Sequence, residues 1–531
     1  MNSDEIVRKR VVHRVLEEKA KQHGNRDLFF FKDQVFGYED FDQESSRVAS
    51  GMQSLGLGKG DKVAIVSGNR PEYLFLSYGL SKIGAIQVPI NTAHKGNILT
   101  YMIDHTDCRF LVVESSYLDR VGPILRDLPK IEKILVLKGT EADISALEKP
   151  VLDYETVMDN DGKYDEAEVL WHDPHAIIFT SGTTGPSKGV VLPNNYMFTA
   201  PEGFVQLGKY DERDCLYNPF PFFHVAGLSC ILTALISGAR MSLEQRFSVS
   251  RFWDDIKRHE CTAMQFTGGI ISLIYKSEPK ANDRDNPLRV MIGANAPKDL
   301  VKPFEERFGV TILDTYGSTE LGVCINCTPE KRKPGSCGIP RQDYDVRFVD
   351  DNELEVGTNT PGELLVRPKN PYSMFLEYYK MPDSTVEAWR NLWFHTGDYL
   401  SYDNDGFLYF VDRKHDALRR RGENISSIEV ETVIMSHPAV MEAAALGVKS
   451  EEAENEVMVC VVKKPGHTVT PEELIAHSES RMAYFMVPRF VRFIEKMPKT
   501  PTERIEKYKL RDEGVTPDTW DREKAGYKLK R

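Results

Sequence analysis

The chain has 531 residues, more than one hydrophobic core usually organises, so we expect two or three domains. With 41% hydrophobic and 28% charged residues its composition is that of a globular protein, and no apolar run reaches the ~20 residues that a membrane-spanning helix needs. The net charge of −12, with lysine and arginine spread along the chain, argues against a nucleic-acid partner.

Residues 1–24 have the pattern of a charged amphipathic helix and lack the apolar centre of a signal peptide. We therefore expect a cytoplasmic protein that is neither exported nor membrane-spanning. The eight cysteines are scattered, and only Cys324 and Cys327 have CxxC spacing. Because a zinc site needs a second pair of ligands, we interpret this pair as incidental and expect reduced thiols.

Apolar runs alternate with helical patterns at the start of the chain. Residues 28–31 and 37–41 predict two short strands around a turn, and a helix is expected through residues 52–55. The βαβ alternation that follows predicts an open, mostly parallel sheet with helices on both faces. The polar, acidic segment 139–173 predicts a connector. The runs behind this alternation are the strands 63–66, 86–89, 110–113 and 134–137 and the helix 71–83.

The α/β pattern continues from residue 195 to about residue 308. From residue 335 to about residue 410, short alternating strands predict a small β-rich subdomain. A last compositional unit begins near Asp412 and is long enough for a core of its own. We therefore expect an α/β fold, with a domain 1–412 of stacked α/β sheets plus the β-rich subdomain, and a small α+β domain 413–531. The strands and helix that mark these regions are 362–367, 407–410, 443–448, 457–463 and a helix from residue 471.

A loop rich in glycine and hydroxyl groups follows the apolar run 177–179, where the chain reads IIFTSGTTGPSKG. The run predicts a buried strand. The glycines and a proline prevent regular structure beyond it, while hydroxyls, backbone N–H groups and a lysine can face an anion. An ordinary glycine-rich hairpin is the alternative, but the hydroxyl density and the lysine favour a cradle for phosphates. The cradle residues are Thr180, Ser181, Gly182, Thr183, Thr184, Gly185 and Lys188.

This loop is not a Walker A motif, which would need glycine where Ser187 stands and a hydroxyl residue where Gly189 stands. It closely resembles the phosphate loop of the adenylate-forming superfamily of acyl-CoA synthetases, aryl-CoA ligases, luciferases and peptide-synthetase adenylation domains. Further segments resemble the same superfamily in the same order, from about residue 36 to residue 511. The resemblance implies that the small C-terminal domain is mobile and that the protein uses ATP, Mg²⁺ and coenzyme A.

Two segments resemble the superfamily's nucleotide-binding motifs. In DTYGSTE, the resemblance implies that Tyr316 stacks on adenine, Thr319 touches the α-phosphate and Glu320 holds Mg²⁺. An aromatic face and a hard oxygen ligand suit those roles. WFHTGD resembles the segment whose aspartate, here Asp398, binds the ribose hydroxyls, and Arg413 stands where the domain junction reaches the ribose or phosphate. The nucleotide-binding residues expected in these segments are Asp314, Tyr316, Gly317, Thr319, Asp398 and Arg413.

Two other segments resemble the acyl and coenzyme A sites. In YNPFPFFHVAG, the resemblance implies that His224 lines the acyl pocket, although a lone histidine among aromatic residues is more often packed in a core. RGENI resembles the loop that lines the pantetheine tunnel, with Arg421 and Gly422, whose missing side chain would let a thin thiol arm pass. The arginine run 419–421 is either a solvated face or an attraction for a phosphorylated ligand.

The chain departs from the superfamily pattern near its end. Residues 498–511 read PKTPTERIEKYKLR, with Arg504 in place of the lysine that bridges the acyl carboxylate and the α-phosphate. Arginine keeps the charge but binds as a planar fork, so the exchange is not conservative, and Lys507 is the alternative surrogate. His415 stands where the superfamily usually has a lysine or aspartate hinge. This histidine would either make rotation of the C-terminal domain sensitive to pH or be a solvated side chain.

The resemblance implies an AMP-forming carboxylate–CoA ligase that works through an acyl-adenylate. The expected catalytic residues are His224, Glu320, Arg504 and Lys507, with Glu320 as the metal ligand. The run MIGANAP is similar to carnitine and crotonobetaine CoA ligases, so we expect a small to medium, polar or carnitine-like acid. Asn295 in this run would contact either that acid or the adenine. Gly317 leaves room for an acid larger than acetate.

Other functions share part of this pattern. A peptide-synthetase adenylation domain would need a carrier domain, which we do not expect after residue 511, while a luciferase-type oxygenase shares all the motifs. A catalytically weakened nucleotide-binding regulator of the same fold is the main alternative, because of Arg504. Lys188, Glu320 and Asp398 count against it, since a pure binding module does not need a metal ligand. The expected partners are a small carboxylic acid, ATP and coenzyme A, and homo-oligomerisation is left open.

Overall fold

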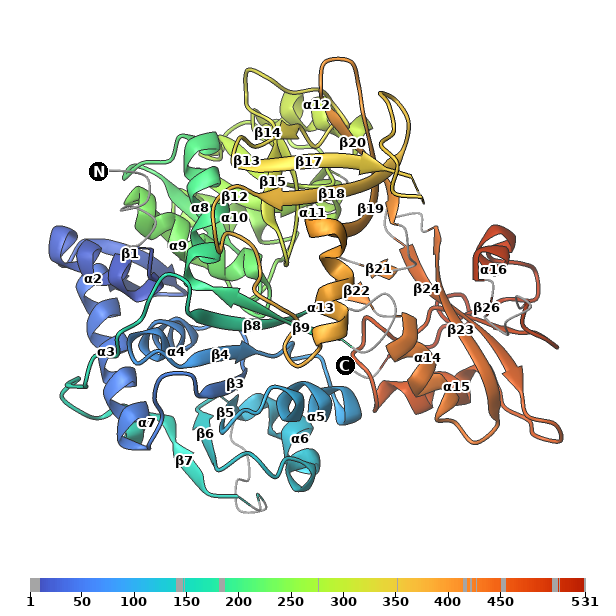
Figure 1. The fold of residues 1–531 in the computed structure, drawn as a ribbon, viewed down its shortest axis with the longest axis horizontal. Helices are drawn as coiled ribbons and strands as arrows, with labels where there is room; N and C mark the ends of the chain where they lie inside the picture. Colours follow the sequence, from blue (N-terminus) through green and yellow to red (C-terminus); the bar gives the residue numbers. More distant parts are fainter. Residues whose placement is uncertain are drawn as a thin grey trace. The chain divides into compact units, whose positions relative to one another are not determined.

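The chain divides into two compact units in a computed structural model (Figure 1). The first unit consists of Met1–Thr92, Ile103–Phe179 and Gly189–Asp412, and the second of Ala93–Met102, Thr180–Lys188 and Arg413–Arg531. The predicted division at a single position, residue 412, does not assign Ala93–Met102 and Thr180–Lys188 to the second unit. The structure describes residues 10–139, 147, 149–180, 187–275, 277–350, 352–413, 418–420, 423–425, 427–449, 455–498, 505 and 507–529.

In the described residues, the first unit holds a nine-stranded sheet in the order β16-β15-β14-β13-β12-β10-β11-β1-β2. Its inner strands, from β14 to β1, are parallel, and antiparallel pairs close both edges. Parallel strands need crossover connections, which the helices α9 to α12 supply. The strands are β1 (Asp27–Phe31), β2 (Gln34–Gly37), β10 (Cys215–Asn218), β11 (Arg240–Leu243), β12 (Ala263–Thr267), β13 (Val290–Ala294), β14 (Thr311–Ser318), β15 (Gly322–Asn326) and β16 (Ile339–Pro340).

A seven-stranded sheet in the order β7-β6-β5-β3-β4-β8-β9 also lies within the described chain. The pairs from β7 to β8 are parallel, which confirms the predicted βαβ alternation. The strands are β3 (Lys62–Val66), β4 (Ile86–Pro89), β5 (Phe110–Glu114), β6 (Lys133–Leu137), β7 (Val151–Asp153), β8 (Pro174–Thr180) and β9 (Lys188–Pro193).

Two sequence predictions in this region are wrong. The predicted strand 37–41 is instead the start of helix α3 (Tyr38–Ser54), because the Asp40 carboxylate accepts a hydrogen bond from the Gly37 N–H (2.9 Å) and caps the helix. The predicted connector 139–173 contains β7 and the short helix α7 (Tyr154–Met158). β7 pairs with β6 through its backbone and has no fully buried residue, so it carries no hydrophobic pattern.

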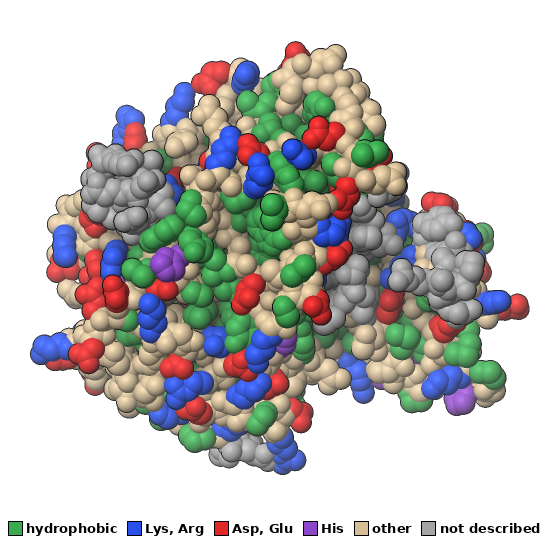
Figure 2. All heavy atoms as spheres, in the orientation of Figure 1, with side chains coloured by type: hydrophobic (Ala, Val, Ile, Leu, Met, Phe, Trp, Pro, Cys, Tyr) green, Lys and Arg blue, Asp and Glu red, His purple; other side chains and the backbone are tan. Residues whose placement is uncertain are grey.

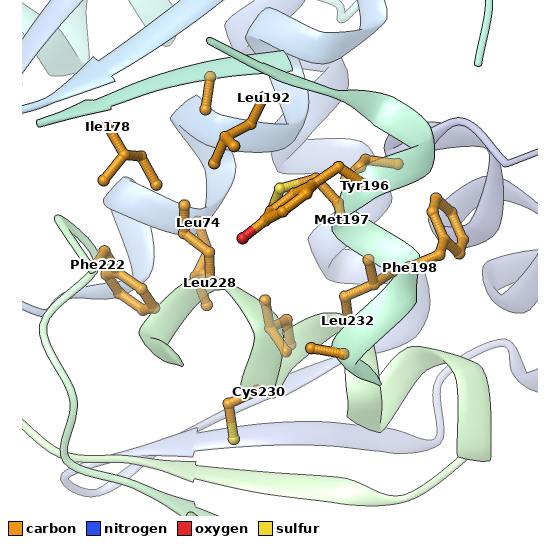
Figure 3. Packing of buried hydrophobic residues seen from close by; sticks show 14 of the residues in the cluster. Leu74, Ile178, Leu192, Tyr196, Met197, Phe198, Phe222, Leu228, Cys230 and Leu232 are labelled. Carbon is orange, nitrogen blue, oxygen red and sulfur yellow. The ribbon is translucent and has the colours of Figure 1, made fainter. Parts of the chain in front are cut away.

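Helices fill the space between the two large sheets. One hydrophobic core includes side chains of α2, α3, α4, α8 and α9 together with strands of both sheets. Figure 3 shows part of this core, where Leu74, Tyr196 and Leu228 meet Ile178 and Leu192 of the seven-stranded sheet. The helices of this region are α2 (Val12–His23), α3, α4 (Pro71–Lys82), α5 (Gly96–His105), α6 (Leu118–Val121), α7, α8 (Asn194–Gly208) and α9 (Val225–Ser237), with the 3₁₀ helices η1 (Ser115–Tyr117) and η2 (Gly122–Asp127).

The nine-stranded sheet is covered on its other face as well. Along β13, Val290 and Ile292 belong to the core between the sheets, whereas Met291 belongs to a second core with α10, α11 and α12. This alternation is the period of two that a strand imposes on its side chains. Helices on both faces explain why these strands read as continuous apolar runs. The covering helices are α10 (Phe252–Arg258), α11 (Gly268–Tyr275) and α12 (Lys298–Phe308).

A small antiparallel sheet follows in the first unit, as expected for the β-rich segment from residue 335. Its order is β17-β18-β19-β20 among the described residues, and β18 is antiparallel to both β17 and β19. It carries Asp398 on its third strand. The elements are β17 (Tyr344–Val349), β18 (Gly362–Pro368), α13 (Pro382–Ala388), η3 (Arg390–Leu392), β19 (Phe394–Tyr402) and β20 (Leu408–Arg413).

The second unit has its own core, built on a four-stranded sheet in the order β23-β24-β25-β26 in its described part. Helix α15 begins at Pro471, as predicted, because Thr470 and Glu473 form a capping box before it. The elements are β21 (Leu418–Arg420), β22 (Glu423–Ile425), α14 (Ser427–Met435), β23 (Val440–Lys449), β24 (Asn455–Lys463), α15 (Pro471–Glu479), β25 (Phe490–Phe493), α16 (Lys507–Glu513) and β26 (Trp520–Asp521).

Arg420 in this second unit serves neither of the two roles considered for the arginine run 419–421. Its guanidinium pairs with the Glu456 carboxylate at 2.7 Å, and both side chains are buried, with 4% and 6% exposed. It also donates hydrogen bonds to the carbonyls of Phe485 (3.1 Å) and Val487 (3.4 Å). The middle arginine of the run therefore fixes the fold of the second unit.

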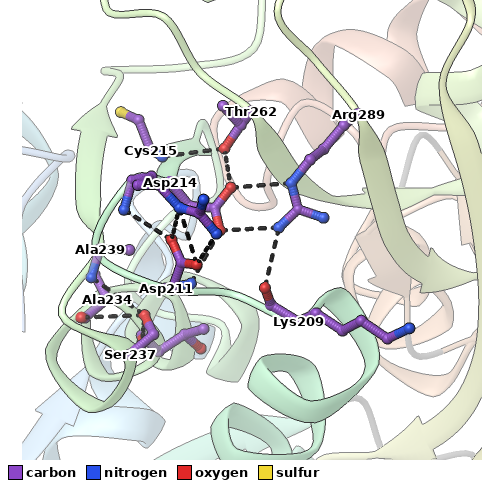
Figure 4. A network of polar contacts seen from close by, with 11 residues as sticks. Lys209, Asp211, Asp214, Cys215, Ala234, Ser237, Ala239, Thr262 and Arg289 are labelled. Carbon is purple, nitrogen blue, oxygen red and sulfur yellow. Dashed lines mark hydrogen bonds and ion pairs between the residues drawn. The ribbon is translucent and has the colours of Figure 1, made fainter.

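A polar network holds the amino ends of three parallel strands together (Figure 4). Asp214, Thr262 and Arg289 each precede a strand of the nine-stranded sheet by one residue. The Asp214 carboxylate accepts hydrogen bonds from the Thr262 hydroxyl (2.6 Å) and from Arg289 Nε (3.0 Å) and Nη2 (2.9 Å). These residues at the amino ends of the strands therefore stabilise the sheet.

The described surface mixes charges, and acidic and basic side chains are interspersed over the face in Figure 2. Among the described residues, no helix combines the length and the apolarity of a membrane span. All eight cysteines are free thiols and are buried. Burial raises the pKa of Cys108 and of Cys324 to about 12, so neither is a thiolate at neutral pH.

Candidate functional site

Residues predicted to bind nucleotide and acid lie where the parallel strands of the nine-stranded sheet end, here called the carboxyl edge. Thr267 and Ala294 are register partners that end β12 and β13, and Thr315 is the partner of Ala294 on β14. His224 follows β10 on the adjoining turn, and Asn295 directly follows β13. In open α/β sheets, ligands bind in the crevice outside these strand ends.

The structure brings Tyr316 and Asp398 together across 82 residues of sequence. The Tyr316 hydroxyl donates a hydrogen bond to Asp398 Oδ2 (2.7 Å), and the two residues are 7% and 9% exposed. Burial and the Asp398 charge raise the pKa of Tyr316 well above its usual range, so the hydroxyl remains a donor. An aromatic ring beside an enclosed carboxylate is suited to a nucleoside, which offers a flat base and a diol.

Asp314 fixes the loop after β13. Its Oδ1 accepts a hydrogen bond from the Thr315 N–H (3.0 Å) and its Oδ2 from the Ala296 N–H (3.1 Å). Burial raises the pKa of the Asp314 carboxyl to about 7, although both backbone donors oppose that shift. Asp314 therefore shapes the carboxyl edge between β13 and β14.

We expect Asp314 to make stability depend on pH. Its folded pKa of about 7 lies above the unfolded value, so the folded state holds a proton that the unfolded state has lost. The contribution of Asp314 to stability is then greatest below roughly pH 4 and falls by up to about 4 kcal/mol as pH rises through 7. Urea unfolding across this range should show a shallower decline for Asp314→Asn than for the wild type. Parallel curves for the two proteins would contradict the assignment.

Glu320, the predicted metal ligand, has both carboxylate oxygens oriented by hydroxyl groups. The Ser318 hydroxyl donates to Oε2 (3.0 Å), and the Tyr378 hydroxyl donates to Oε1 (3.1 Å). Each oxygen keeps a lone pair for a cation. No group of three or more metal-ligating side chains occurs among the described residues. A single hard carboxylate fits Mg²⁺, which is commonly held by one or two carboxylates together with substrate phosphates.

Gly317 and Asn295 have structural reasons for their identity. A Cβ at Gly317 would lie 2.0 Å from the Gly322 carbonyl oxygen, because β14 bulges against β15 at this point. Asn295 has a φ of 62°, in the left-handed region that asparagine tolerates better than most residues. Its side chain is exposed, and Thr319 is half-buried. The glycine therefore keeps the strand pair closed, whatever ligand lies beside it.

Two hydrogen bonds and one ring contact hold the turn that carries His224. Asn218 donates to the Gly227 carbonyl (3.2 Å) and accepts from the Phe220 N–H (3.2 Å). The ring of Phe222 stacks on Tyr73 at a centroid distance of 4.7 Å. His224 itself is half-buried, at the amino end of α9.

Sequence reasoning missed two residues of this region. Asn69, after β3, donates to the carbonyls of Phe220 and Glu244 (2.9 Å each) and so links the seven-stranded sheet to the carboxyl edge. Tyr378 was missed because its contact with Glu320 spans 58 residues. An asparagine three residues beyond a buried parallel strand was the local signal available for Asn69.

The second unit holds the end of the glycine-rich loop. The Ser187 N–H (3.2 Å) and hydroxyl donate to Glu429 Oε1, and Tyr101 donates to the Ser187 carbonyl (3.1 Å). Thr180 ends β8 and Lys188 begins β9, both half-buried. The predicted residues that lie outside the described part of the chain are Ser181, Gly182, Thr183, Thr184, Gly185, His415, Arg421, Gly422 and Arg504, together with the side chain of Arg413.

Lys507 is engaged within the second unit. Its ammonium group lies 2.5 Å from Glu431 Oε1 and donates to the Ser427 hydroxyl (2.8 Å). Glu431 Oε1 also accepts from the Ala445 N–H (2.7 Å). Lys507 thus ties α16 to α14 and β23, and it would have to leave this pair to contact a substrate.

Comparisons with known proteins cover nearly the whole chain. Residues 16–379 match the family model described as AMP-binding enzyme, and residues 429–504 match that of the AMP-binding enzyme C-terminal domain. The chain is 29% identical to crotonobetaine/carnitine–CoA ligases of Salmonella typhimurium and Proteus mirabilis, over 96% and 95% of this chain and 100% of each relative. A double mutant of o-succinylbenzoate CoA synthetase from Bacillus subtilis is similar in structure, with a TM-score of 0.81 and 25% identity, covering 94% of this chain and 98% of the other.

Proposed function

The chain belongs to the AMP-binding enzyme family, and from this premise we propose that it activates a small to medium, polar or carnitine-like carboxylic acid with ATP and transfers it to coenzyme A. Its reaction class is that of the AMP-forming acyl-CoA synthetases, which work through an acyl-adenylate. The observation that carries the proposal is the Tyr316–Asp398 hydrogen bond, because this pair and Glu320 would together contact the base, the ribose and the metal.

The proposed substrate class rests on two lines of support. The relatives that are 29% identical act, by name, on crotonobetaine and carnitine. Asn295 presents an exposed amide beside the strand ends, where it can contact a polar acid or the adenine. We place the acid near the turn of His224, which we propose as the acyl-pocket residue.

Each remaining residue then has a proposed role in the first step. Tyr316 and Asp398 hold adenine and ribose, and Thr180, Lys188 and Thr319 contact the phosphates. Mg²⁺ bound at Glu320 would neutralise phosphate charge as the acid attacks the α-phosphorus and pyrophosphate leaves. The residues of the loop outside the described chain, from Ser181 to Gly185, are proposed to complete the phosphate cradle.

The second step is proposed to use the other unit. Coenzyme A would enter beside the loop of Arg421 and Gly422, and its thiolate would attack the acyl-adenylate, so that AMP leaves. We propose domains 1–412 and 413–531, with rotation about the junction at Arg413 between the two steps. Lining the site with different residues in each step lets one pocket serve two transition states.

The proposed function is tested by measuring pyrophosphate release from ATP and Mg²⁺ with carnitine, crotonobetaine, and short, medium, long-chain and aryl acids, each with and without coenzyme A. We expect one acid to drive release and to yield its CoA thioester. If ATP binds but no acid releases pyrophosphate, while Arg504→Lys restores release, the wild type is a weakened nucleotide-binding regulator. Release without any thioester would exclude the ligase.

Asp398→Asn should raise the KM for ATP about 10- to 100-fold, because a neutral amide makes weaker hydrogen bonds to the ribose than a carboxylate does. The matched control is Tyr316→Phe, which removes the other end of the 2.7 Å hydrogen bond and keeps the carboxylate. Steady-state kinetics should show a smaller rise for that control. An unchanged KM for ATP in Asp398→Asn would remove Asp398 from the nucleotide site.

A further inference from the structure

Tyr378 links Glu320 to β9, the strand that follows the glycine-rich loop. Its hydroxyl donates to Glu320 Oε1 (3.1 Å), and its ring is 5% exposed. A buried hydroxyl that donates from this position can hold one oxygen of the carboxylate in a fixed orientation.

The backbone around Tyr378 is fixed to β9. The Leu376 N–H donates to the Val191 carbonyl (2.8 Å), the Val191 N–H to the Glu377 carbonyl (3.0 Å), and the Tyr379 N–H to the Gly189 carbonyl (2.7 Å). Tyr378 itself bridges Val190. β9 begins at Lys188, so the strand that leaves the glycine-rich loop is hydrogen-bonded to the residues on both sides of Tyr378.

The same segment also fixes the backbone of Glu320. The Phe375 N–H donates to the Glu320 carbonyl (2.9 Å), and the ring of Phe375 packs on that of Tyr378 at a centroid distance of 4.9 Å. The Tyr378 N–H donates to the Thr385 hydroxyl (3.0 Å). Residues 375–379 therefore hold both the main chain and the side chain of Glu320, and several hydrogen bonds fix the conformation of this segment.

We propose that Tyr378 is a positioning residue for Mg²⁺–ATP: it orients Oε1 of Glu320 toward the metal and couples that orientation to the strand leaving the phosphate loop. This inference rests on the proposed function, in which Glu320 is the metal ligand. Groups that orient a metal ligand commonly change metal affinity or activity 10- to 100-fold when removed. A residue of packing alone would change stability and leave the metal dependence as it was.

The test measures ATP affinity of the full-length protein by displacement of a fluorescent ATP analogue, with Mg²⁺ and with EDTA. In the wild type we expect Mg²⁺ to tighten ATP binding. Tyr378→Phe keeps the ring and should lose about tenfold of that enhancement, with unchanged affinity in EDTA. The matched control is Tyr344→Phe, which removes an equally buried hydroxyl that bonds the Leu321 carbonyl (3.0 Å), not the Glu320 carboxylate, and should behave as wild type.

Three other outcomes would overturn the inference in distinguishable ways. If Glu320→Gln loses the Mg²⁺ enhancement and Tyr378→Phe retains it, Tyr378 only packs. If Tyr344→Phe loses as much as Tyr378→Phe, the effect is a general consequence of a missing hydroxyl. If Glu320→Gln retains the enhancement, or the wild type does not bind ATP, the metal role or the proposed function itself fails, and this inference fails with it.

Discussion

Arg504→Ala is expected to slow acid-dependent pyrophosphate release about 100- to 1,000-fold, because it would remove the cation that we propose to bridge the acid and the α-phosphate. Lys507 cannot compensate without cost, since its ammonium group pairs with Glu431 at 2.5 Å and bonds Ser427 at 2.8 Å. Arg504 is therefore the better candidate for the missing lysine. Single-turnover measurement of pyrophosphate release separates this effect from thioester formation.

The control for this prediction is Lys507→Ala. It should lower the unfolding midpoint of the second unit, because it removes the cation that pairs with Glu431, while adenylation slows far less than in Arg504→Ala. If Lys507→Ala releases pyrophosphate more slowly than Arg504→Ala does, the catalytic role belongs to Lys507. An active Arg504→Ala variant would show that neither arginine nor lysine is needed at this position.

Glu456→Ala is expected to destabilise the second unit by about 3–5 kcal/mol, because it removes one member of a buried ion pair and leaves the other member buried. The two charged groups lie 2.7 Å apart and are almost inaccessible to water. Arg420 would keep its hydrogen bonds to the carbonyls of Phe485 and Val487, which do not neutralise its charge. Urea unfolding followed by circular dichroism measures the shift.

The matched control is Glu513→Ala in the same unit. Glu513 pairs with Arg492 at 2.6 Å, but its side chain is 51% exposed, so water screens the pair. Exposed pairs contribute at most about 1 kcal/mol, and we expect a shift of that size or less. Equal shifts in the two variants would mean that the Arg420–Glu456 pair gains nothing from its burial.

Much of the fold could be predicted from hydrophobic periodicity. β3, β4, β5 and β6 are short apolar runs, and Pro71 marks the start of the helix between the first two. β7 could not be predicted, because a strand whose residues are all half-buried carries no apolar pattern. The strand predicted at residues 37–41 is wrong. Tyr38 and Phe41 are both buried and three residues apart, a spacing that indicates a helix and not a strand.

The candidate site was predictable as a set of residues but not as a set of contacts. Motif resemblance selected Tyr316, Glu320 and Asp398, and the parallel topology explains why the first two lie at one edge of the sheet. The hydrogen bond from Tyr316 to Asp398 joins two separate sheets, so no local pattern could indicate it. The burial of Arg420 was hidden for the same reason, because its partner lies 36 positions away on β24.

The burial of all eight thiols makes the native protein almost unreactive toward maleimides and similar labels, since the labels cannot reach the sulfur atoms. A single cysteine introduced at an exposed lysine, such as Lys280 in the first unit or Lys464 in the second, would then be modified selectively. Pairs of such positions could carry donor and acceptor dyes without removing any native cysteine. The rotation of the second unit that we propose could thus be tested by energy transfer between the two dyes.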